Sequence, residues 1–166
     1  MSTSSIRYIS GTCSLGILLL AFSEKGLCAL LLGDDLATLE RDLARRFSDD
    51  LQRDEGLTPQ LEQTLRHLDN PRQALDFPLD LAGSVFQRQV WAALRQIPVG
   101  QTASYRDIAQ RLDQPNAFRA VANACGANPI AVIVPCHRVL RQDGSLGGYR
   151  WGLERKQQLL DREAQL

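Results

Sequence analysis

The sequence contains few residues of the kinds that build disulfide frameworks or metal sites. Its 166 residues include four cysteines and two histidines, and no two cysteines form a CxxC pair. This composition argues against a disulfide scaffold and against a zinc finger, and isolated thiols are typical of a reducing cytoplasm. We therefore expect a cytoplasmic protein that binds no metal.

Long apolar runs are also missing. The best candidate, Leu15–Phe22, has the length of a strand and is far shorter than the roughly 20 residues that a membrane span requires. Residues 1–5 lack the basic start and the apolar stretch of a secretory signal. The sequence predicts no association with a membrane.

The net charge is zero because two unlike halves cancel. Residues 1–83 carry 8 Lys and Arg against 13 Asp and Glu, a net charge of −5, whereas residues 84–166 carry 11 against 6, a net charge of +5. A basic half joined to an acidic half indicates that the basic half meets a polyanion.

The N-terminal half has the pattern of a small antiparallel sheet followed by helices. Short apolar runs between turn residues predict strands at Ile6–Ile9, Leu15–Phe22 and Leu27–Leu32. Apolar spacing then predicts a helix from Leu36 to Phe47, capped by Asp34 or Asp35, and a second helix over Leu57–Leu68.

Two prolines, Pro71 and Pro78, interrupt the periodicity that follows these helices. We therefore place a domain boundary here, with an N-terminal α/β domain at residues 1–79 and a second domain at residues 80–166.

The second domain is helical in pattern. Ser84 can cap a helix that ends at Pro98 and Gly100. Ser104 and Asp107 then have the spacing of a capping box at the start of another helix. A turn leads into a further short helix over Asn116–Cys125, and two short helices joined by a tight turn predict a helix-turn-helix.

The second of these short helices has an unusual outer face. Spacing places Phe118, Val121, Ala122 and Cys125 on its buried stripe. The opposite face carries small residues and one arginine at its border, namely Asn116, Ala120, Asn123, Ala127 and Arg119. Such a face fits either a tight helix contact within the protein or a narrow groove of DNA, where the arginine acts as a wedge.

The segment richest in chemistry is Cys136-His137-Arg138, which follows a strand-like apolar run at residues 130–134. A cysteine is often a small buried hydrophobe, and a lone histidine is usually structural. Next to each other and beside an arginine, they indicate a thiolate in a positive neighbourhood. Adjacent side chains of an extended chain point in opposite directions, so contact between the two requires a turn or a bridging water.

A carboxylate on the last helix can complete this group. Within residues 153–166 the apolar stripe contains Leu153, Leu159, Leu160 and Ala164, and Glu163 falls within it. A carboxylate on an apolar face needs a partner, and His137 can serve. Cys136, His137 and Glu163 then form a nucleophile, a base and an orienting carboxylate.

In their order along the chain, these residues closely resemble the O6-alkylguanine-DNA alkyltransferases, and within that family the C-terminal half of the bacterial adaptive-response (Ada-type) proteins. The matching motifs are Arg119-Ala120-Val121, Asn128, Pro135-Cys136-His137-Arg138-Val139 and Gly148-Tyr149-Arg150-Trp151-Gly152. The likeness extends to Cys13-Ser14-Leu15-Gly16 and to residues 28–35, so it covers nearly the whole chain.

The resemblance implies a fold and a reaction. The fold is α/β in two parts, a small ribonuclease-H-like antiparallel sheet with helices and a helical, DNA-binding domain with a helix-turn-helix. The reaction is repair of O6-alkylguanine in double-stranded DNA, in which the Cys136 thiolate takes the methyl group and keeps it as a thioether. Each protein molecule then acts once, as a monomer, and no cofactor is needed because the damaged DNA is the methyl donor.

The resemblance also implies catalytic roles. His137 deprotonates Cys136 through a water, with Glu163 behind it, and Asn128 braces the turn around the site. Tyr105 donates a hydrogen bond to the guanine, which must leave the duplex to reach the thiol.

Further residues are implied to bind DNA or to line the pocket. Arg119 fills the place of the flipped base, and the helix face of Ala120, Asn123 and Ala127 enters the minor groove. The pocket is formed by Val139, Tyr149, Arg150 and Trp151, and the backbone carbonyls of Cys136 and Val139 accept from the guanine amine.

The sequence departs from the family pattern in three ways. Cys13, Cys28 and His67 are too few for the N-terminal zinc site of some members, so we expect no metal. Arg150 and Trp151 stand where some members have serine and glycine, and the indole should favour methyl over benzyl-sized groups. The regulatory domain of the Ada-type proteins is absent from this sequence, which is either a stand-alone chain or a fragment.

Two other functions compete with repair. One is a non-enzymatic sensor of alkylated DNA, which Cys136 argues against because such sensors replace the acceptor cysteine. The other is a thiol-dependent hydrolase, which leaves the predicted helix-turn-helix, Arg119 and the charge asymmetry unexplained.

Overall fold

The computed structural model describes residues 5–47 and 50–166, so the first four residues of the segment examined for a secretory signal lie outside it. The chain divides into two compact units, Met1–Leu81 and Ala82–Leu166.

The N-terminal unit contains a mixed sheet with strand order β3-β2-β1-β4. The strands β1 (Ser5–Cys13), β2 (Gly16–Phe22) and β3 (Leu27–Gly33) form the expected antiparallel meander, so the three predicted strands are confirmed. The fourth strand, β4 (Asp50–Arg53), pairs with β1 in parallel and was not expected from the sequence. It is short and polar, and therefore lacks the apolar alternation by which strands are recognised.

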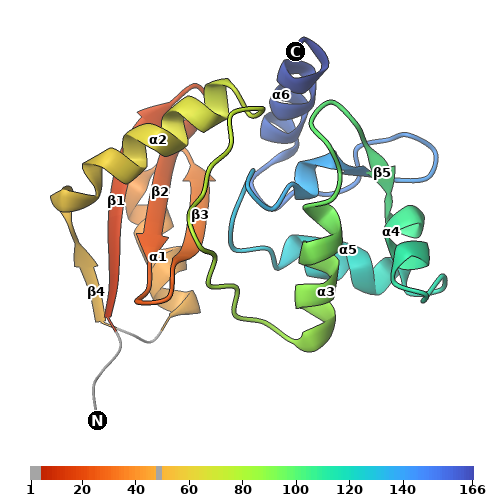
Figure 1. Cartoon of the computed structure of the whole chain (residues 1–166), viewed down its shortest axis with the longest axis horizontal. Coiled ribbons are helices and arrows are strands. Elements are labelled where there is room, and N and C mark those ends of the chain that lie inside the picture. The colour runs from red at the N-terminus through yellow and green to blue at the C-terminus, as the bar shows by residue number, and fades with distance from the viewer. Residues whose placement is uncertain (1–4, 48–49) are drawn as a thin grey trace. The chain divides into compact units, whose positions relative to one another are not determined.

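Two helices cover the sheet (Figure 1). The helix α1 (Leu36–Arg46), capped by Asp35, packs against β2 and β3, and α2 (Thr58–Asp69), preceded by a 3₁₀ turn at Glu55–Leu57, packs against β1. Both helices confirm the sequence prediction. Four consecutive residues of β2, Leu18 to Ala21, are fully buried, which requires that both faces of this strand be covered.

The segment after α2 continues along the sheet. Leu27 donates its backbone N–H to the Pro78 carbonyl at 2.8 Å and accepts from the Asp80 N–H at 2.8 Å, and the Phe22 and Phe77 rings meet edge to face. The proline-containing stretch is thus part of the N-terminal unit up to Leu81.

The C-terminal unit is mainly helical. It contains α3 (Val85–Leu94), α4 (Tyr105–Arg111), α5 (Phe118–Gly126) and α6 (Leu153–Ala164). A short parallel pair joins β5 (Ala103–Ser104) to β6 (Val139–Leu140). Together with the N-terminal sheet, this gives the mixed α/β architecture that the sequence predicts.

Local sequence signals explain where these helices begin. Ser84 and Gln87 form a capping box at α3, and Ser104 and Asp107 form the predicted capping box at α4. The Trp91 side chain on α3 is fully buried and donates its indole N–H to the Ala124 carbonyl of α5 at 2.9 Å, which fixes these two helices against each other.

One predicted element is wrong. Residues 130–134 form a turn and not a strand, and all of them are buried, as expected, except Ile133, which is half-buried. Val132 has a φ of 70°, a left-handed conformation that costs a β-branched residue on the order of 1–3 kcal/mol. Apolar content alone indicates burial and cannot distinguish a strand from a compact turn. No helix within residues 5–47 and 50–166 has the length and apolar character of a membrane-spanning segment.

Candidate active site

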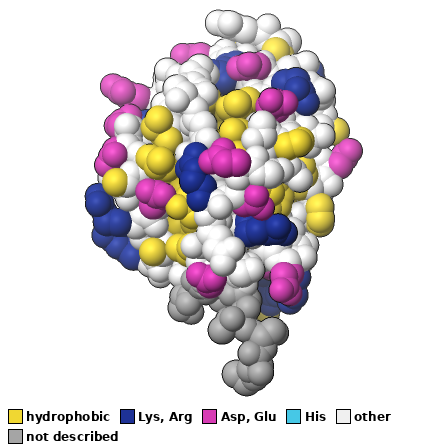
Figure 2. Space-filling model, turned by 90° about the vertical axis from the view of Figure 1, so that its left-hand side faces the viewer, with side chains coloured by type: hydrophobic (Ala, Val, Ile, Leu, Met, Phe, Trp, Pro, Cys, Tyr) yellow, Lys and Arg dark blue, Asp and Glu magenta, His cyan; other side chains and the backbone are white. Residues whose placement is uncertain are grey.

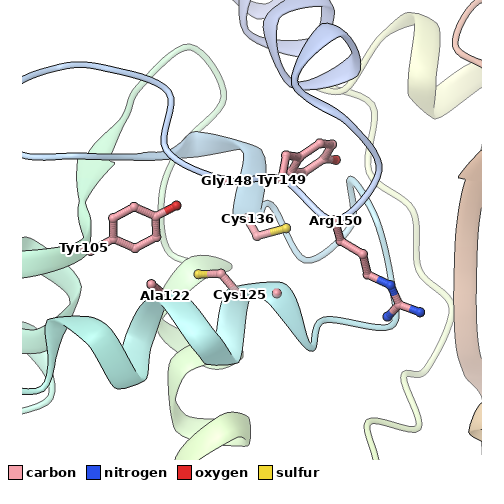
Figure 3. A pocket seen from close by; sticks show the side chains of 8 residues that line it. Tyr105, Ala122, Cys125, Cys136, Gly148, Tyr149 and Arg150 are labelled. Atoms are coloured by element: carbon pink, nitrogen blue, oxygen red, sulfur yellow. The ribbon is translucent and has the colours of Figure 1, made fainter.

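Cys136 lies at the bottom of a small pocket in the C-terminal unit. It begins a 3₁₀ turn at Cys136–Arg138 and is 4% exposed. The pocket has a volume of about 130 Å³ and is lined by Tyr105, Ala122, Cys125, Gly126, Cys136, Gly148, Tyr149 and Arg150 (Figure 3). A space of this size admits a small group beside the thiol.

The strained turn before Cys136 is held by one side chain, Asn128. Its Oδ1 accepts from the Ile130 N–H at 2.9 Å, and its Nδ2 donates to the Val134 carbonyl at 2.9 Å. Both ends of the turn are therefore tied to the same buried amide, which offsets the cost of the φ of Val132.

The same amide reaches the thiol. Asn128 Nδ2 also donates to Cys136 Sγ at 3.2 Å. Burial raises the pKa of Cys136 to about 11, whereas the Asn128 hydrogen bond and the charges of Lys156 and Arg150 act in the opposite direction. The resting thiol is thus protonated at neutral pH and needs a base to become a nucleophile.

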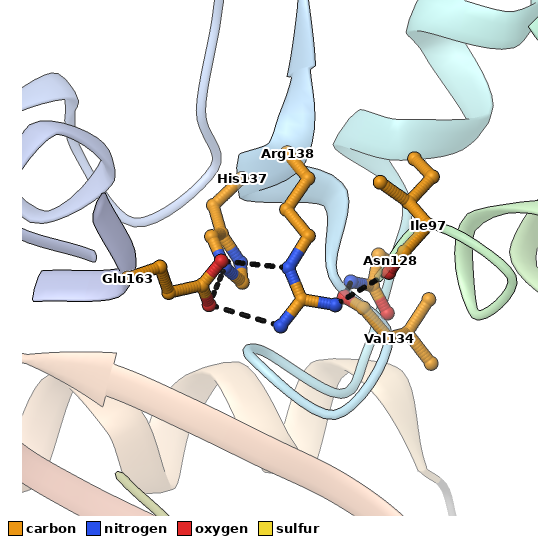
Figure 4. A network of polar contacts seen from close by, with 6 residues as sticks. All are labelled: Ile97, Asn128, Val134, His137, Arg138 and Glu163. Carbon is orange, nitrogen blue, oxygen red and sulfur yellow. Dashed lines mark hydrogen bonds and ion pairs between the residues drawn. The ribbon is translucent and has the colours of Figure 1, made fainter. Parts of the chain in front are cut away.

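His137 and Glu163 form a buried pair next to this turn. His137 Nε2 lies 2.7 Å from Glu163 Oε2, and both side chains are almost completely buried (Figure 4). Burial lowers the pKa of His137, so its ring is neutral at neutral pH. Because the ionised carboxylate only accepts, Nε2 carries the ring proton and Nδ1 is left with its lone pair.

The His137 Nδ1 atom is buried and has no hydrogen-bond partner among the described residues. The 3₁₀ turn brings His137 next to the cysteine, but no hydrogen bond joins the two side chains in the described part of the chain. Of the two routes that the sequence left open, the turn is therefore present, but among the described residues it brings no hydrogen bond between the thiol and the ring.

Arg138 completes the network; the sequence indicated it only as a positive neighbour of Cys136 and His137, and its pairing with Glu163 was not expected. Its Nε and Nη2 donate to the two oxygens of Glu163 at 2.8 and 2.9 Å, and its Nη1 donates to the Ile97 carbonyl at 2.8 Å. Burial alone raises the pKa of Glu163, but the hydrogen bonds from His137 and Arg138 outweigh it and bring the pKa to about 2. Glu163 is thus a fixed anion.

A second buried cation, Lys156, escaped the sequence analysis. Its Nζ donates to the carbonyls of Val139 at 2.7 Å and Gly148 at 3.0 Å and to that of Leu146. It therefore ties the β6 strand to the loop that walls the pocket. Lys156 and Glu163 are seven residues apart on α6, which is the helical spacing that could have revealed a second charge on the apolar face.

Tyr105 stands on the other side of the pocket, at the first position of α4. The Ser104 cap fixes this position, and the Tyr105 ring lies 5.9 Å from Lys156 Nζ. Burial, with the nearby thiols, raises the pKa of Tyr105 to about 12, so the phenol keeps its proton. It can serve as a donor to a molecule in the pocket.

A wider groove of about 490 Å³ adjoins the small pocket. It is lined by Tyr105, Arg106, Phe118, Arg119, Ala122, Arg141, Gln142, Asp143, Gly147 and Gly148. The predicted outer face of α5 is open, because Arg119, Ala120 and Asn123 are exposed and Ala127 is half-buried. Three arginines beside an exposed face of small residues make the groove suited to a polyanion.

The four expected pocket residues take different positions. Tyr149 and Arg150 line the pocket. Val139 and Trp151 are not among the residues that line it. Trp151 is buried, with its ring 5.4 Å from that of Tyr149 and 5.3 Å from the Arg150 guanidinium, and the Val139 carbonyl accepts from Lys156. No group of histidine, cysteine and acidic side chains within the described residues could hold a metal ion.

Comparison with known proteins identifies similar sequences. Residues 85–165 match the family model described as 6-O-methylguanine DNA methyltransferase, DNA binding domain. The chain is 49% identical over 162 residues to the bifunctional transcriptional activator/DNA repair enzyme Ada of Escherichia coli, covering 96% of this chain and 46% of that protein. It is 48% identical over 110 residues to the inducible methylated-DNA–protein-cysteine methyltransferase of Bacillus subtilis, covering 66% of this chain and 62% of that protein. The chain thus spans about half the length of the first of these relatives.

Solved structures with the same fold are also known. The structure of Mycobacterium tuberculosis O6-methylguanine methyltransferase superimposes with a TM-score of 0.80 at 35% identity, covering 96% of this chain and 93% of that one. A structure of M. tuberculosis OGT in complex with DNA superimposes with a TM-score of 0.78 at 36% identity, covering 97% of this chain and 93% of that one.

Proposed function

Because this chain belongs to the family of O6-methylguanine-DNA methyltransferases, we propose that it repairs DNA by direct reversal, moving the methyl group of O6-methylguanine in double-stranded DNA onto Cys136. The observation that carries the proposal is the buried Cys136 thiol at the base of a small pocket, with the Asn128 amide on one side and the His137–Glu163 pair nearby. The enzyme is consumed in the reaction, because removing the methyl group from the thioether would require the cysteine thiolate to leave, and a thiolate is a poor leaving group from an uncharged thioether.

The route by which the Cys136 proton leaves follows from the tautomer of His137. Its Nδ1 lone pair accepts the Cys136 proton through a water, and Glu163 stabilises the imidazolium that forms. The thiolate then attacks the methyl carbon, so that an S–C bond forms as the C–O6 bond breaks. The departing guanine takes up one proton, and the net exchange is one methyl group for one proton.

Two features support the roles of Asn128 and Tyr105. Asn128 donates directly to Sγ, and this hydrogen bond favours the charged sulfur. Tyr105 keeps its proton and lines the pocket opposite Cys136, so it can donate to the guanine as negative charge develops on the ring.

We further propose that α4 and α5 form a helix-turn-helix that binds the minor groove of DNA. A tight turn at residues 112–117 joins the two helices, and the exposed face of Ala120 and Asn123 lets DNA approach closely. Flipping the base out of the duplex costs a few kcal/mol of stacking and pairing. Arg119 lies in the groove beside the pocket and fills the gap that the flipped base leaves.

In this proposal the two domains have separate tasks, and the protein acts as a monomer. Residues 80–166 bind DNA and accept the methyl group. Residues 1–79 form a ribonuclease-H-like domain. The sheet supports this, because its antiparallel meander is extended by one strand, β4, that runs parallel to β1. Methyl adducts are preferred over benzyl-sized ones, because the pocket beside Cys136 is small and Trp151 packs edge to face against Tyr149 in its wall.

The test is intact-protein mass spectrometry after incubation with excess duplex DNA containing one O6-methylguanine, followed by peptide mapping. We expect one added methyl group per protein, located on Cys136. The variant Cys136→Ser should gain none, while Cys28→Ala, which removes a buried thiol of the N-terminal unit, should still gain one. Turnover without a lasting adduct would favour a thiol hydrolase, and DNA binding without methyl gain would favour a lesion sensor.

A further inference from the structure

Arg150 lines the pocket but has no part in the steps described above. It follows Tyr149 in the segment between β6 and α6, and its side chain crosses to the end of α5. There its Nη1 donates to the backbone carbonyl of Asn128 at 2.9 Å. Figure 3 shows the guanidinium on the side of Cys136 opposite to Tyr105.

The partner of Arg150, Asn128, holds both the turn before Cys136 and the thiol itself. Asn128 donates from its amide to Val134 and to the thiol, accepts on Oδ1 from Ile130, and donates its backbone N–H to the Cys125 carbonyl. The bond from Arg150 occupies its remaining polar atom. Because one rigid amide carries the thiol contact, any tilt of the Asn128 backbone moves the donor away from Sγ.

The electrostatic surroundings of Cys136 give Arg150 a second effect. The titratable groups that face the thiol are Lys156 from α6, Cys125 from α5, Tyr105 from α4, and Tyr149 and Arg150 from the segment before α6, with His137 adjacent in sequence. Only Lys156 and Arg150 among them are cations in their ordinary state. Burial lowers the pKa of Lys156, whereas a guanidinium keeps its charge throughout the working range.

We propose that Arg150 is a positioning residue for the nucleophile, which holds Asn128 behind the Cys136 thiol and favours the thiolate by its permanent charge. This inference rests on the proposed function in taking Cys136 as the reacting group. The guanidinium lies 5.3 Å from the centre of the Trp151 ring and donates to the Asn128 carbonyl, so the cation is restrained by two contacts although the residue as a whole is exposed.

The test measures the thiol without DNA. Iodoacetamide is used as a small probe, and the rate of Cys136 alkylation is followed by peptide mapping as a function of pH. In Arg150→Met, which keeps the length of the side chain, the profile should shift to higher pH by up to about one unit. The rate near neutral pH should then fall by up to about tenfold, since one pKa unit changes the thiolate fraction tenfold.

Two further variants make the result specific. Arg150→Lys keeps the charge with a less well-fitted donor and should restore part of the rate. Arg88→Met removes an exposed arginine of α3 and should match the wild-type profile. Thermal melting of each variant shows that the protein is folded.

Three outcomes separate the possibilities. An Arg150→Met profile identical to the wild-type profile would overturn the inference. Unchanged thiol reactivity with slower methyl transfer from DNA would also overturn it and assign Arg150 to DNA contact. A wild-type protein that takes no methyl group from DNA would refute the proposed function, but the pH profiles would still decide the role of Arg150.

Discussion

The two units of this protein bury different kinds of side chain. In the N-terminal unit the consecutive residues Leu18 to Ala21 and Leu27 to Leu32 are buried, and Thr64 is the one polar residue among its described positions that is equally buried. The C-terminal unit buries Asn128, His137, Arg138, Lys156 and Glu163. Burial of aliphatic side chains drives folding, whereas each buried charge costs several kcal/mol unless partners satisfy it.

This difference distinguishes a unit with an aliphatic core from the unit that contains the candidate site. Salt bridges of the N-terminal unit, such as Arg53–Glu55, lie at the surface, where they contribute little. Figure 2 shows basic and acidic side chains intermixed on one such face of the molecule. The bridge between Arg138 and Glu163 is enclosed and holds the base of the proposed reaction. Polar groups at this density are stable only because nearly every one of them has a partner.

The comparison is tested most severely by removing one carboxylate from each unit. Glu163→Ala leaves the Arg138 guanidinium buried without its anion and should lower the free energy of unfolding by about 3–5 kcal/mol. Glu55→Ala breaks a surface pair with a similar 2.7 Å separation and should cost less than about 1 kcal/mol. Urea denaturation of both variants measures the two values.

The rate of methyl transfer provides the control for these two variants. Glu55→Ala should accept a methyl group from O6-methylguanine DNA at the wild-type rate, whereas Glu163→Ala should be much slower even where it is folded. Equal losses of stability in the two variants would contradict the distinction between the units.

A smaller effect is expected on acidification. Glu163 has a pKa of about 2 in the folded protein, because hydrogen bonds from His137 and Arg138 outweigh its burial, and an unfolded glutamate titrates near 4.3. Its contribution is therefore present above about pH 4.3 and is lost as the pH falls toward 2. It amounts to no more than about 3 kcal/mol on the scale of 1.36 kcal/mol per pKa unit.

His137 acts in the same direction. Burial lowers its pKa, so the unfolded state takes up a proton below about pH 6.5 while the folded state resists it, and stability falls. Urea denaturation between neutral and acidic pH should show a steady decline. In Glu163→Gln the decline should be shallower, because the titrating carboxyl is gone, and an unchanged slope would show that other groups dominate.

Much of this fold could be predicted from the sequence because its signals are local. The meander, α1, α2 and the Ser104 capping box all follow from apolar spacing and capping residues within a few positions. The β4 strand could not be predicted, since its pairing with β1 joins residues that are about 45 positions apart. The turn at 130–134 was predicted as a strand because its conformation is imposed by Asn128 and not by its own residues.

The candidate site shows the same division. Glu163 was expected on a buried face with a histidine partner, and the structure pairs it with His137. Lys156 and the burial of Arg138 against Glu163 were not predicted, because charged side chains are ordinarily assigned to the surface. Only the carbonyls and the carboxylate that accept their hydrogen bonds make this burial possible. The contributions of these residues to methyl transfer stay predictions.

The smallest expected effect concerns one helix cap in each unit. Asp35 caps α1 in the N-terminal unit and Ser104 caps α4 in the C-terminal unit, and replacing either by alanine should cost about 1 kcal/mol of stability. Only Ser104 precedes a pocket residue, because its cap fixes the first turn on which Tyr105 stands. Ser104→Ala should therefore slow methyl transfer by roughly threefold, since small misplacements of a reacting group reduce rates steeply, whereas Asp35→Ala should leave the rate unchanged. Single-turnover kinetics on both variants, at a temperature where each is fully folded, would contradict this division if the two rates fell together.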